Sequence, residues 1–351
     1  MTELVLAPQR RATWLFSRRI DLLAFGGSAL LSFVILGIGA RAGVLHSEAP
    51  EWAWIGGVLL VDVAHVWSTI FRTYLDGAEL RRRPMLYSVV PIAAYLIGLV
   101  LYDAGAIVFW RCLAYLAIFH FIRQQYGWVA LYRNRADERS GRWIDMLAIY
   151  AATLYPLLWW HANLPRKFNW FVPNDFPFSI SSDVATYATP LYWAILALYA
   201  ARSIAQGFPN PGKDLVVGTT ALCWYVGIVA LNSDFAFTVT NVFIHGLPYI
   251  ALVYIYQRER GEVASAANRI LRFGLPAFLM ILWVIAFAEE ALWDRALWHE
   301  RAWLFGSWSI ASTERWLVPL LAVPQIAHYV LDGFIWRRRY GVRPSLFTFS
   351  T

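Results

Sequence analysis

Apolar stretches long enough to cross a membrane recur along the whole 351-residue chain. A hydrocarbon core about 30 Å thick needs about 20 apolar residues in a helix, and each stretch is bounded here by charge, by Gly or Pro, or by Trp. Hydrophobic residues make up 59% of the chain and charged residues only 15%, unlike a soluble globular protein. We predict ten spanning helices, at residues 22–40, 53–75, 85–102, 106–132, 143–161, 186–205, 214–231, 234–257, 273–290 and 316–336.

Basic residues are distributed unevenly between the connections of this bundle. With a cytoplasmic N-terminus, 22 of the 30 Lys and Arg residues fall in the even-numbered connections and the two tails, and seven fall in the odd-numbered ones. Cytoplasmic loops of membrane proteins are enriched in Lys and Arg, so we expect both termini in the cytoplasm. The same distribution explains the net charge of +7 without nucleic acid as a partner. We expect an all-α, multi-pass bundle of the cell (inner) membrane.

Two connections are long and aromatic. We predict a single transmembrane domain over 1–351, with outer loops at 162–185 and 291–315 that contain "RKFNWFVPNDFPF" and "ALWDRALWHERAWLFGSW". We expect these loops to anchor the bundle at the membrane interface, with a lid over a substrate entrance as the alternative. Cys112 and Cys223 lie in apolar spans without metal-type spacing, so we expect them to be small hydrophobic residues.

Four of the seven histidines lie inside apolar spans, on four different predicted helices that all run from the outside to the inside. These are His65, His120, His245 and His328. At a rise of 1.5 Å per residue, each lies roughly 15 to 21 Å below the outer boundary, so the four share one layer near the midplane. The other three fall in or beside outer loops, where a histidine is usually solvated, and they are His46, His161 and His299.

Each of the four midplane histidines belongs to a polar stripe with spacings of three and four, which place it on one helix face. The stripes are Asp62, His65, Thr69, Arg72 and Asp76; His120, Arg123, Gln124 and Gly127; Thr238, Asn241, His245 and Tyr249; and Gln325, His328 and Asp332. Ionisable groups at membrane depth are unfavourable unless they face a partner or a cavity. We therefore expect the four polar faces to meet inside the bundle.

The four histidines suggest a metal site. Neutral imidazole is the commonest side-chain ligand for Fe, Cu and Zn, and a ligand histidine usually donates its second N–H to a carboxylate, amide or carbonyl. Asp62, Asn241 and Asp332 are spaced for that role, and Arg123 is expected to pair with Asp332 or Asp76. We predict a site suited to ferrous iron that holds O2 beside an apolar substrate. The candidate catalytic residues around it are Asp62, Arg123, Gln124, Asn241, Tyr249 and Asp332.

Three segments around these histidines are informative together. They are "IFHFIRQQYGW" around His120, "NVFIHGLPYI" around His245 and "LLAVPQIAHYVLDGFIWRRR" around His328. In these segments the chain resembles the Brp/Blh family of membrane-embedded β-carotene dioxygenases. In that family, histidines on separate transmembrane helices bind a non-haem iron that adds O2 across the central double bond of a carotenoid and releases retinal. The resemblance implies a dioxygenase that acts on a carotenoid or another long apolar lipid.

The chain departs from the family pattern at two places. The first family motif, of the type Pro-His-Gly-x-x-x-Asp, is represented only by "DVAHVWS" around His65. The third family motif has a second histidine four residues after the first, where this chain has Tyr249. Either His328 supplies the missing ligand or the site has one nitrogen fewer. The resemblance therefore favours a metal-dependent membrane oxygenase more than carotenoid cleavage as such.

Other functions remain open at this point. Four histidines on four helices also suit two bis-imidazole haem sites, as in haem A synthases and membrane cytochromes. The ionisable residues within the spans would equally suit the ion path of a transporter, or the chain could be a structural subunit. Desaturases of the clustered-histidine type need HxxxH and HxxHH boxes, which this sequence lacks. An oxygenase without flavin or nicotinamide motifs would take any electrons it needs from a partner protein.

Overall fold

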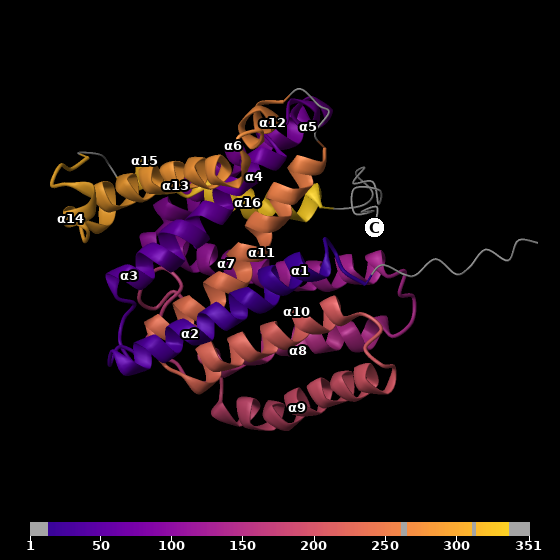
Figure 1. The fold of residues 1–351 in the computed structure, drawn as a ribbon. Helices are drawn as coiled ribbons and strands as arrows, with labels where there is room; N and C mark the ends of the chain where they lie inside the picture. Colours follow the sequence, from indigo (N-terminus) through magenta and orange to yellow (C-terminus); the bar gives the residue numbers. More distant parts are fainter. Residues whose placement is uncertain (1–12, 261–264, 311–313, 337–351) are drawn as a thin grey trace, which may run out of the picture.

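The chain folds into a bundle of long helices, with no β-strand among the described residues. The computed structural model describes residues 13–260, 265–310 and 314–336. The α-helices are α1 (Arg18–Asp21), α2 (Ser28–Arg41), α3 (Glu51–Ala53), α4 (Ala64–Arg72), α5 (Gly77–Arg82), α6 (Pro84–Ala104), α7 (Ala106–Arg135), α8 (Arg142–Ala162), α9 (Ser182–Ala205), α10 (Pro211–Trp224), α11 (Asp234–Glu259), α12 (Ala266–Leu271), α13 (Gly274–Trp293), α14 (Ala302–Phe305), α15 (Glu314–Leu321) and α16 (Val323–Ile335). The all-α architecture expected from the sequence is confirmed (Figure 1).

Four segments have the wider winding of a π-helix and join α-helices into longer rods. They are η1 (Leu22–Gly27), η2 (Trp54–Val63), η3 (Tyr225–Ala230) and η4 (Asp294–Trp298). The longest of them, η2, runs directly into α4. π-helical segments are rare and occur frequently at functional sites, so the start of α4 is a place to look for one.

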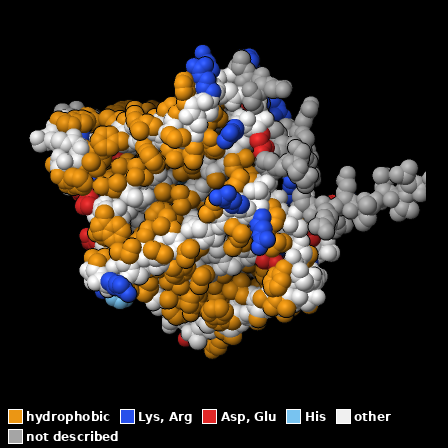
Figure 2. All heavy atoms as spheres, in the orientation of Figure 1, with side chains coloured by type: hydrophobic (Ala, Val, Ile, Leu, Met, Phe, Trp, Pro, Cys, Tyr) orange, Lys and Arg blue, Asp and Glu red, His pale blue; other side chains and the backbone are white. Residues whose placement is uncertain are grey.

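Nine helical rods in the described part of the chain are long and apolar enough to cross a membrane. They are Arg18–Arg41, Glu51–Arg72, Pro84–Ala104, Ala106–Arg135, Ser182–Ala205, Pro211–Ala230, Asp234–Glu259, Gly274–Trp298 and Glu314–Ile335. Hydrophobic side chains cover most of the molecular face drawn in Figure 2, as a surface in contact with lipid requires. The chain is therefore a multi-pass membrane bundle. The predicted span 273–290 ends too early, because the rod continues through η4 to Trp298.

The fifth predicted span, 143–161, forms helix α8, which is not one of these nine rods. It has 21 residues, but Asp145, His161 and several Tyr and Trp residues make it less apolar than the others. It packs against α7, α9 and α10 (Figure 1). The positions of the two ends of the described chain show whether α8 crosses the bundle. If both ends lie on the same side, the number of crossings is even.

Both ends of the described chain lie at the same end of the bundle. Arg135, at the end of α7, donates a hydrogen bond to the carbonyl oxygen of Trp14 at 3.3 Å. Arg72, at the end of α4, donates to the carbonyl oxygen of Ile335 at 3.2 Å. The chain therefore crosses the bundle an even number of times, which makes α8 the tenth crossing. We call this end, marked by Arg72 and Arg135, the basic face.

The other helix ends lie together at the opposite end of the bundle, which we call the outer-loop face. There the backbone N–H of Phe235 donates to the carbonyl oxygen of Ser47 at 3.2 Å, and Arg301 pairs with Glu51 at 3.1 Å. The connections between the helices thus lie alternately at the outer-loop face and at the basic face, as predicted from the sequence. The cytoplasmic placement of the basic face stays a prediction. Six of the arginines that suggested it lie outside the described residues, namely Arg10, Arg11, Arg337, Arg338, Arg339 and Arg343.

Helix α11 lies at the centre of the bundle and is the most buried rod, with 89% of its apolar window inside the protein. It packs against α2, η2, α4, α10 and η3. Glycine makes two of these contacts possible. Gly39 of α2 faces the ring of Phe235, and Gly227 of η3 faces Thr240, so that a Cβ atom at either glycine would overlap the facing side chain. The neighbouring helices therefore lie unusually close to α11.

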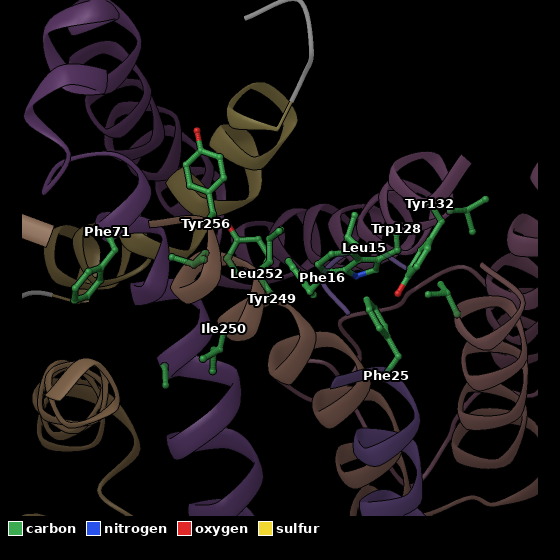
Figure 3. Packing of buried hydrophobic residues seen from close by; sticks show 14 of the residues in the cluster. Leu15, Phe16, Phe25, Phe71, Trp128, Tyr132, Tyr249, Ile250, Leu252 and Tyr256 are labelled. Atoms are coloured by element: carbon green, nitrogen blue, oxygen red, sulfur yellow. The ribbon is translucent and has the colours of Figure 1, made fainter. Parts of the chain in front are cut away.

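Aromatic packing fixes the start of the chain against α7. The ring of Phe25 lies edge-on to Trp128 at 5.0 Å and to Tyr132 at 5.8 Å between ring centroids (Figure 3). The hydroxyl of Tyr132 donates to Asp21 at 2.7 Å, and Asp21 also accepts the backbone N–H of Leu15 at 2.6 Å. The beginning of the first rod is therefore held by both apolar and polar contacts at the basic face.

The loop at 162–185 differs from the interfacial anchor expected from its composition. Phe168 and Phe176 are buried, and Trp170 lies edge-on to Phe121 of α7 at 4.9 Å. Asp175 accepts the backbone N–H groups of residues 170 and 171, which fixes the turn. The loop thus packs into the bundle through its aromatic side chains. In the other loop, 291–315, Trp303 and Trp308 are exposed, and residues 311–313 lie outside the described ones.

A cluster of five charged side chains joins α7, α8, α9 and α10 near the basic face. They are Arg133, Glu138, Asp145, Arg202 and Lys213. Asp145 is fully buried and pairs with all three cations, with Lys213 Nζ at 3.0 Å and an Arg202 nitrogen at 3.0 Å. Burial raises the pKa of Glu138, but the hydrogen bonds from Lys213 and Asn210 and the charge of Arg133 outweigh burial, so the pKa lies below its ordinary value.

We predict that Asp145→Asn destabilises the bundle by about 3 to 5 kcal/mol, because it leaves Glu138 alone to balance three largely buried cations. Thermal or denaturant unfolding of the detergent-solubilised protein measures the loss. Asp137→Asn is the control, since Asp137 pairs with Arg139 in solvent. An Asp145→Asn protein as stable as the control would show that the cluster does not hold α8 and α9 in place.

Candidate metal centre

The four midplane histidines converge inside the bundle, as predicted from their matched depth. His65 lies on α4, His120 on α7, His245 on α11 and His328 on α16. One ring nitrogen of each lies within 4.8 Å of the others, and all four side chains are buried. We call this set the four-histidine cluster. It could bind a metal ion.

The Nε2 atoms face the middle of the four-histidine cluster. His65 Nε2 and His245 Nε2 are 3.1 Å apart. The Nε2 atoms of His120 and His328 are buried and make no hydrogen bond within the described part of the chain. Two nitrogens held about 2.1 Å from one ion lie about 3 to 3.4 Å apart. The residue types and the 3.1 Å spacing of the His65 and His245 nitrogens therefore fit a metal ion held by neutral imidazoles.

Aromatic rings stack on two of the four imidazoles. Phe121 of α7 stacks on His245 with the ring centroids 3.5 Å apart, and Tyr329 of α16 stacks on His120 at 4.6 Å. The histidine rings themselves meet edge to face, with His120 and His328 at 4.6 Å. The stacked rings fix the orientation of the imidazoles and exclude water from their faces.

A hydrogen-bonded chain orients His328. The Tyr249 hydroxyl donates to Asp332, so the Thr69 hydroxyl, 3.1 Å from the Tyr249 oxygen, is the donor in that pair. Thr69 Oγ1 in turn lies 2.7 Å from His328 Nδ1 and accepts its proton. This order of donors places the proton of the neutral imidazole on Nδ1 and the lone pair of Nε2 in the four-histidine cluster. Asp332 therefore acts on His328 through Tyr249 and Thr69, and not directly as its spacing suggested.

Asp62 is the acidic neighbour of His65, as expected. Its Oδ1 atom lies 3.5 Å from His65 Nδ1, across the junction of η2 and α4. Gly246 of α11 makes this junction possible, because a Cβ atom there would lie 2.7 Å from Val61 Cγ1 and 3.5 Å from His65 Cβ. The closeness of α11 to η2 sets the distance between His65 and His245.

Asn241 does not orient His245, so that expectation is wrong. Its amide donates to the carbonyl oxygen of Phe237 at 2.9 Å and to Thr240 Oγ1 at 3.2 Å. The side chain turns back along α11 because η3 packs closely beside it at Gly227. Gln124 has a role that its spacing did not specify: its amide donates to the backbone carbonyl of His245 at 2.8 Å and ties α7 to α11.

The expected pairing of Arg123 with Asp76 or Asp332 is also wrong. Arg123 is exposed and donates to the hydroxyl of Tyr150 at 2.6 Å, on the side of α7 that faces α8. Asp76 instead pairs with Arg260 at 2.6 Å. Arg123 and Gln124 are adjacent and so point about 100° apart around α7, which lets Gln124 face α11 while Arg123 faces α8.

The remaining histidines stay outside the four-histidine cluster, as expected. His46 and His299 are exposed. His161 is buried rather than solvated, because its two ring nitrogens bind the hydroxyl of Tyr115 at 2.9 Å and the carbonyl oxygen of Leu157 at 2.8 Å. It is therefore a structural side chain of α8.

Sequence reasoning missed three side chains that shape the site. Thr69 belonged to the predicted stripe of His65 but had no assigned role. A hydroxyl one turn after a histidine indicates a hydrogen-bonding group on the same helix face. Phe121 and Tyr329 directly follow His120 and His328 in the sequence. An aromatic residue beside a histidine is too common to indicate stacking, so no pattern would have found these two.

Comparison of the chain with protein-family models, with curated proteins and with solved structures gives no match. The functional assignment therefore rests on the residues of the four-histidine cluster and their surroundings.

We predict that Gly246→Ala weakens metal binding at the four-histidine cluster, because the added methyl group pushes η2 and His65 away from α11. Gly56→Ala, in η2, is the control, since a Cβ atom there meets nothing within 4 Å. Metal content after dialysis against a range of chelator concentrations gives the two affinities. Equal affinities would show that the spacing of His65 and His245 does not depend on this contact.

We predict that Thr69→Val weakens metal binding by about 10-fold to 100-fold, the usual effect of losing a hydrogen-bond partner of a ligand histidine. Thr69→Ser keeps the hydroxyl and should restore the affinity. Thr153→Val is the control, because Thr153 is buried but binds only carbonyl oxygens of its own helix. Chelator competition measures all four proteins, and the same loss in Thr69→Ser would assign the effect to packing.

Proposed function

We propose that this protein is a membrane-embedded non-haem iron oxygenase that uses O2 on a long apolar lipid, such as a carotenoid. The supporting observation is the four-histidine cluster, in which four imidazoles from four helices converge at mid-depth in a membrane bundle. Ionisable groups at this depth mark functional sites by default. Imidazole suits iron as well as Zn, Cu and Ni, and the sequence resemblance to the Brp/Blh dioxygenases is what favours iron among them.

The compactness of the four-histidine cluster favours a metal ion over haem. Bis-imidazole haem needs two histidines on opposite sides of a flat macrocycle, with free space around its edge. Here the other two histidines occupy that space, since all four ligand nitrogens lie within 4.8 Å of one another. Phe121 and Tyr329 are packed directly on two of the imidazoles. This packing gives no support to a macrocycle between the rings.

The charged residues also give little support to an ion path across the bundle. Arg72 and Asp76, at the basic face, are paired with Glu79 and Arg260. Arg123 faces α8 and not the four-histidine cluster. A continuous transport path would need ionisable groups from one face to the other.

The chain's own residues would divide the work as follows. The four histidines would hold ferrous iron, which supplies the reactivity towards O2. Asp62 and Thr69 would orient His65 and His328 through their second ring nitrogens. Phe121 and Tyr329 would keep water from the imidazole faces, so that the reaction proceeds in an apolar environment. The Tyr249 hydroxyl, held by Asp332, would keep its proton within the chain that leads to His328.

The substrate class follows from the position of the site and from the sequence resemblance. A site buried at mid-depth, within walls of apolar and aromatic side chains, is suited to a molecule that already lies in the bilayer and enters sideways. The resemblance to the Brp/Blh dioxygenases supports a carotenoid. The family histidine that is replaced by Tyr249 does not reduce the ligand number, because His328 joins the four-histidine cluster. We propose the cell membrane as the location and a partner protein as the source of any electrons required.

We predict that the detergent-purified protein contains close to one iron per chain and shows no Soret band. Alanine substitution of any residue of the four-histidine cluster should remove most of the iron, because three neutral imidazoles hold it weakly at this depth. The matched controls are His46→Ala, His161→Ala and His299→Ala. Metal analysis and an absorption spectrum measure both properties. A Soret band, or an equal loss of iron in all seven variants, would contradict the proposal.

The oxygenase activity is tested separately on the iron-loaded protein. The protein is supplied with carotenoids and with other long apolar lipids in micelles under O2, and O2 consumption and cleavage products are followed. We expect turnover in the wild type and none in His245→Ala. Iron binding without consumption of O2 for any lipid would support the proposed metal site and contradict the proposed oxygenase activity.

A further inference from the structure

Three acidic side chains lie at membrane depth beside the four-histidine cluster and are not part of it. They are Asp62 of η2 and Glu289 and Glu290 of α13, a helix that packs against η2 and α4 (Figure 1). Glu289 accepts hydrogen bonds from the indole N–H groups of Trp67 and Trp293, the latter at 3.4 Å. Glu290 directly follows Glu289 on α13, and Trp67 follows His65 by two residues on α4, so the two glutamates lie beside the helix that carries His65. Three neighbouring carboxylates in a membrane bundle are unfavourable without a cation nearby.

The inner end of this acidic series meets the metal site. Asp62 Oδ1 is buried without a hydrogen-bond partner among the described residues and lies 3.5 Å from His65 Nδ1. His65 is only 1% exposed, and its Nδ1 atom makes no hydrogen bond of its own there. The series therefore ends beside His65.

The outer end of the series reaches the outer-loop face. Asp294 lies four residues after Glu290, one turn further along the same helical rod, and its carboxylate accepts the backbone N–H of Arg301 at 2.9 Å. Arg301 in turn pairs with the exposed carboxylates of Glu51 and Glu300, both at 3.1 Å. Acidic groups thus follow one another from the surface of the outer-loop face to His65.

On the opposite side, towards the basic face, a buried arginine follows the four-histidine cluster. Arg72 follows His65 by two helical turns, is only 1% exposed and lies between the four-histidine cluster and the basic face. Its guanidinium pairs with Glu79 at 3.4 Å and lies over the ring of Tyr256 at 4.7 Å. A cation that approached from the basic face would meet this guanidinium, together with the other basic residues of that face.

We propose that Asp62, Glu289 and Glu290 form the path by which a divalent cation reaches the four-histidine cluster from the outer-loop face. The inference rests on the proposed metal site and adds how the ion gets there. Carboxylate oxygens replace water ligands of divalent cations, and a series of negative charges raises the rate of cation association. The imidazoles then retain the ion, because transition metals prefer nitrogen ligands to carboxylates.

The test measures how fast the stripped protein takes up metal. Co²⁺ is added to chelator-stripped protein in detergent, and the visible absorption of bound Co²⁺ is followed over time. In the double variant Glu289→Gln/Glu290→Gln we expect uptake at least about tenfold slower, with the same final Co²⁺ content. Glutamine at 289 still accepts the hydrogen bonds of Trp67 and Trp293. Glu314→Gln is the matched control, an exposed residue of the outer-loop face that accepts the hydrogen bond of Tyr102, and its uptake rate should not change.

The possible outcomes separate this inference from the proposed function. An unchanged uptake rate in the double variant would overturn the path and leave the metal site intact. A lower final Co²⁺ content at an unchanged rate would also overturn it, because the glutamates would then only balance the charge of the bound ion. Failure of the wild type to bind Co²⁺ would overturn both the path and the metal site.

Discussion

The meeting of four imidazoles in an apolar bundle is the constraint on which the rest of the structure depends. Water is not available there to satisfy the ring nitrogens, so each ring must find a partner in the protein or share an ion. The rotation of α4, α7, α11 and α16 about their own axes is therefore fixed. Side chains away from the rings maintain it: Gln124 ties α7 to the backbone of His245, and Thr69 joins α4 to His328.

Charge is arranged differently at the two ends of the bundle. At the basic face, cations and anions are matched, as in the cluster around Asp145, and this pairing attaches the outermost helices α8 and α9 to the bundle. Between the outer-loop face and the histidines, Glu289 is held by the indole N–H groups of Trp67 and Trp293, and neither Glu289 nor Glu290 forms a salt bridge with another described residue. The first arrangement has a structural role. The second is the arrangement that we propose as a path for cations.

The helices and the depth of the histidines could be predicted from the sequence because both follow from fixed lengths. Bilayer thickness sets the length of a span, and the rise per residue places His65, His120, His245 and His328 in one layer. Contacts one turn away from a histidine could not be predicted, since the direction of a side chain depends on its neighbours in space. Asn241 turned back towards its own helix, and Arg123 turned towards α8. Glu289 and Glu290 escaped notice because the span predicted over 273–290 ended at them, although the rod continues to Trp298.

The position of the buried Arg72 on one side of the site and of the carboxylates on the other has an electrical consequence. An ion that moves from the outer-loop face to the four-histidine cluster travels along the membrane normal and crosses roughly half of the field across the membrane. For a divalent ion, a potential of about 100 mV then changes the free energy of binding by about 2 kcal/mol. The occupancy of the site in a living cell would therefore depend on membrane voltage as well as on metal concentration.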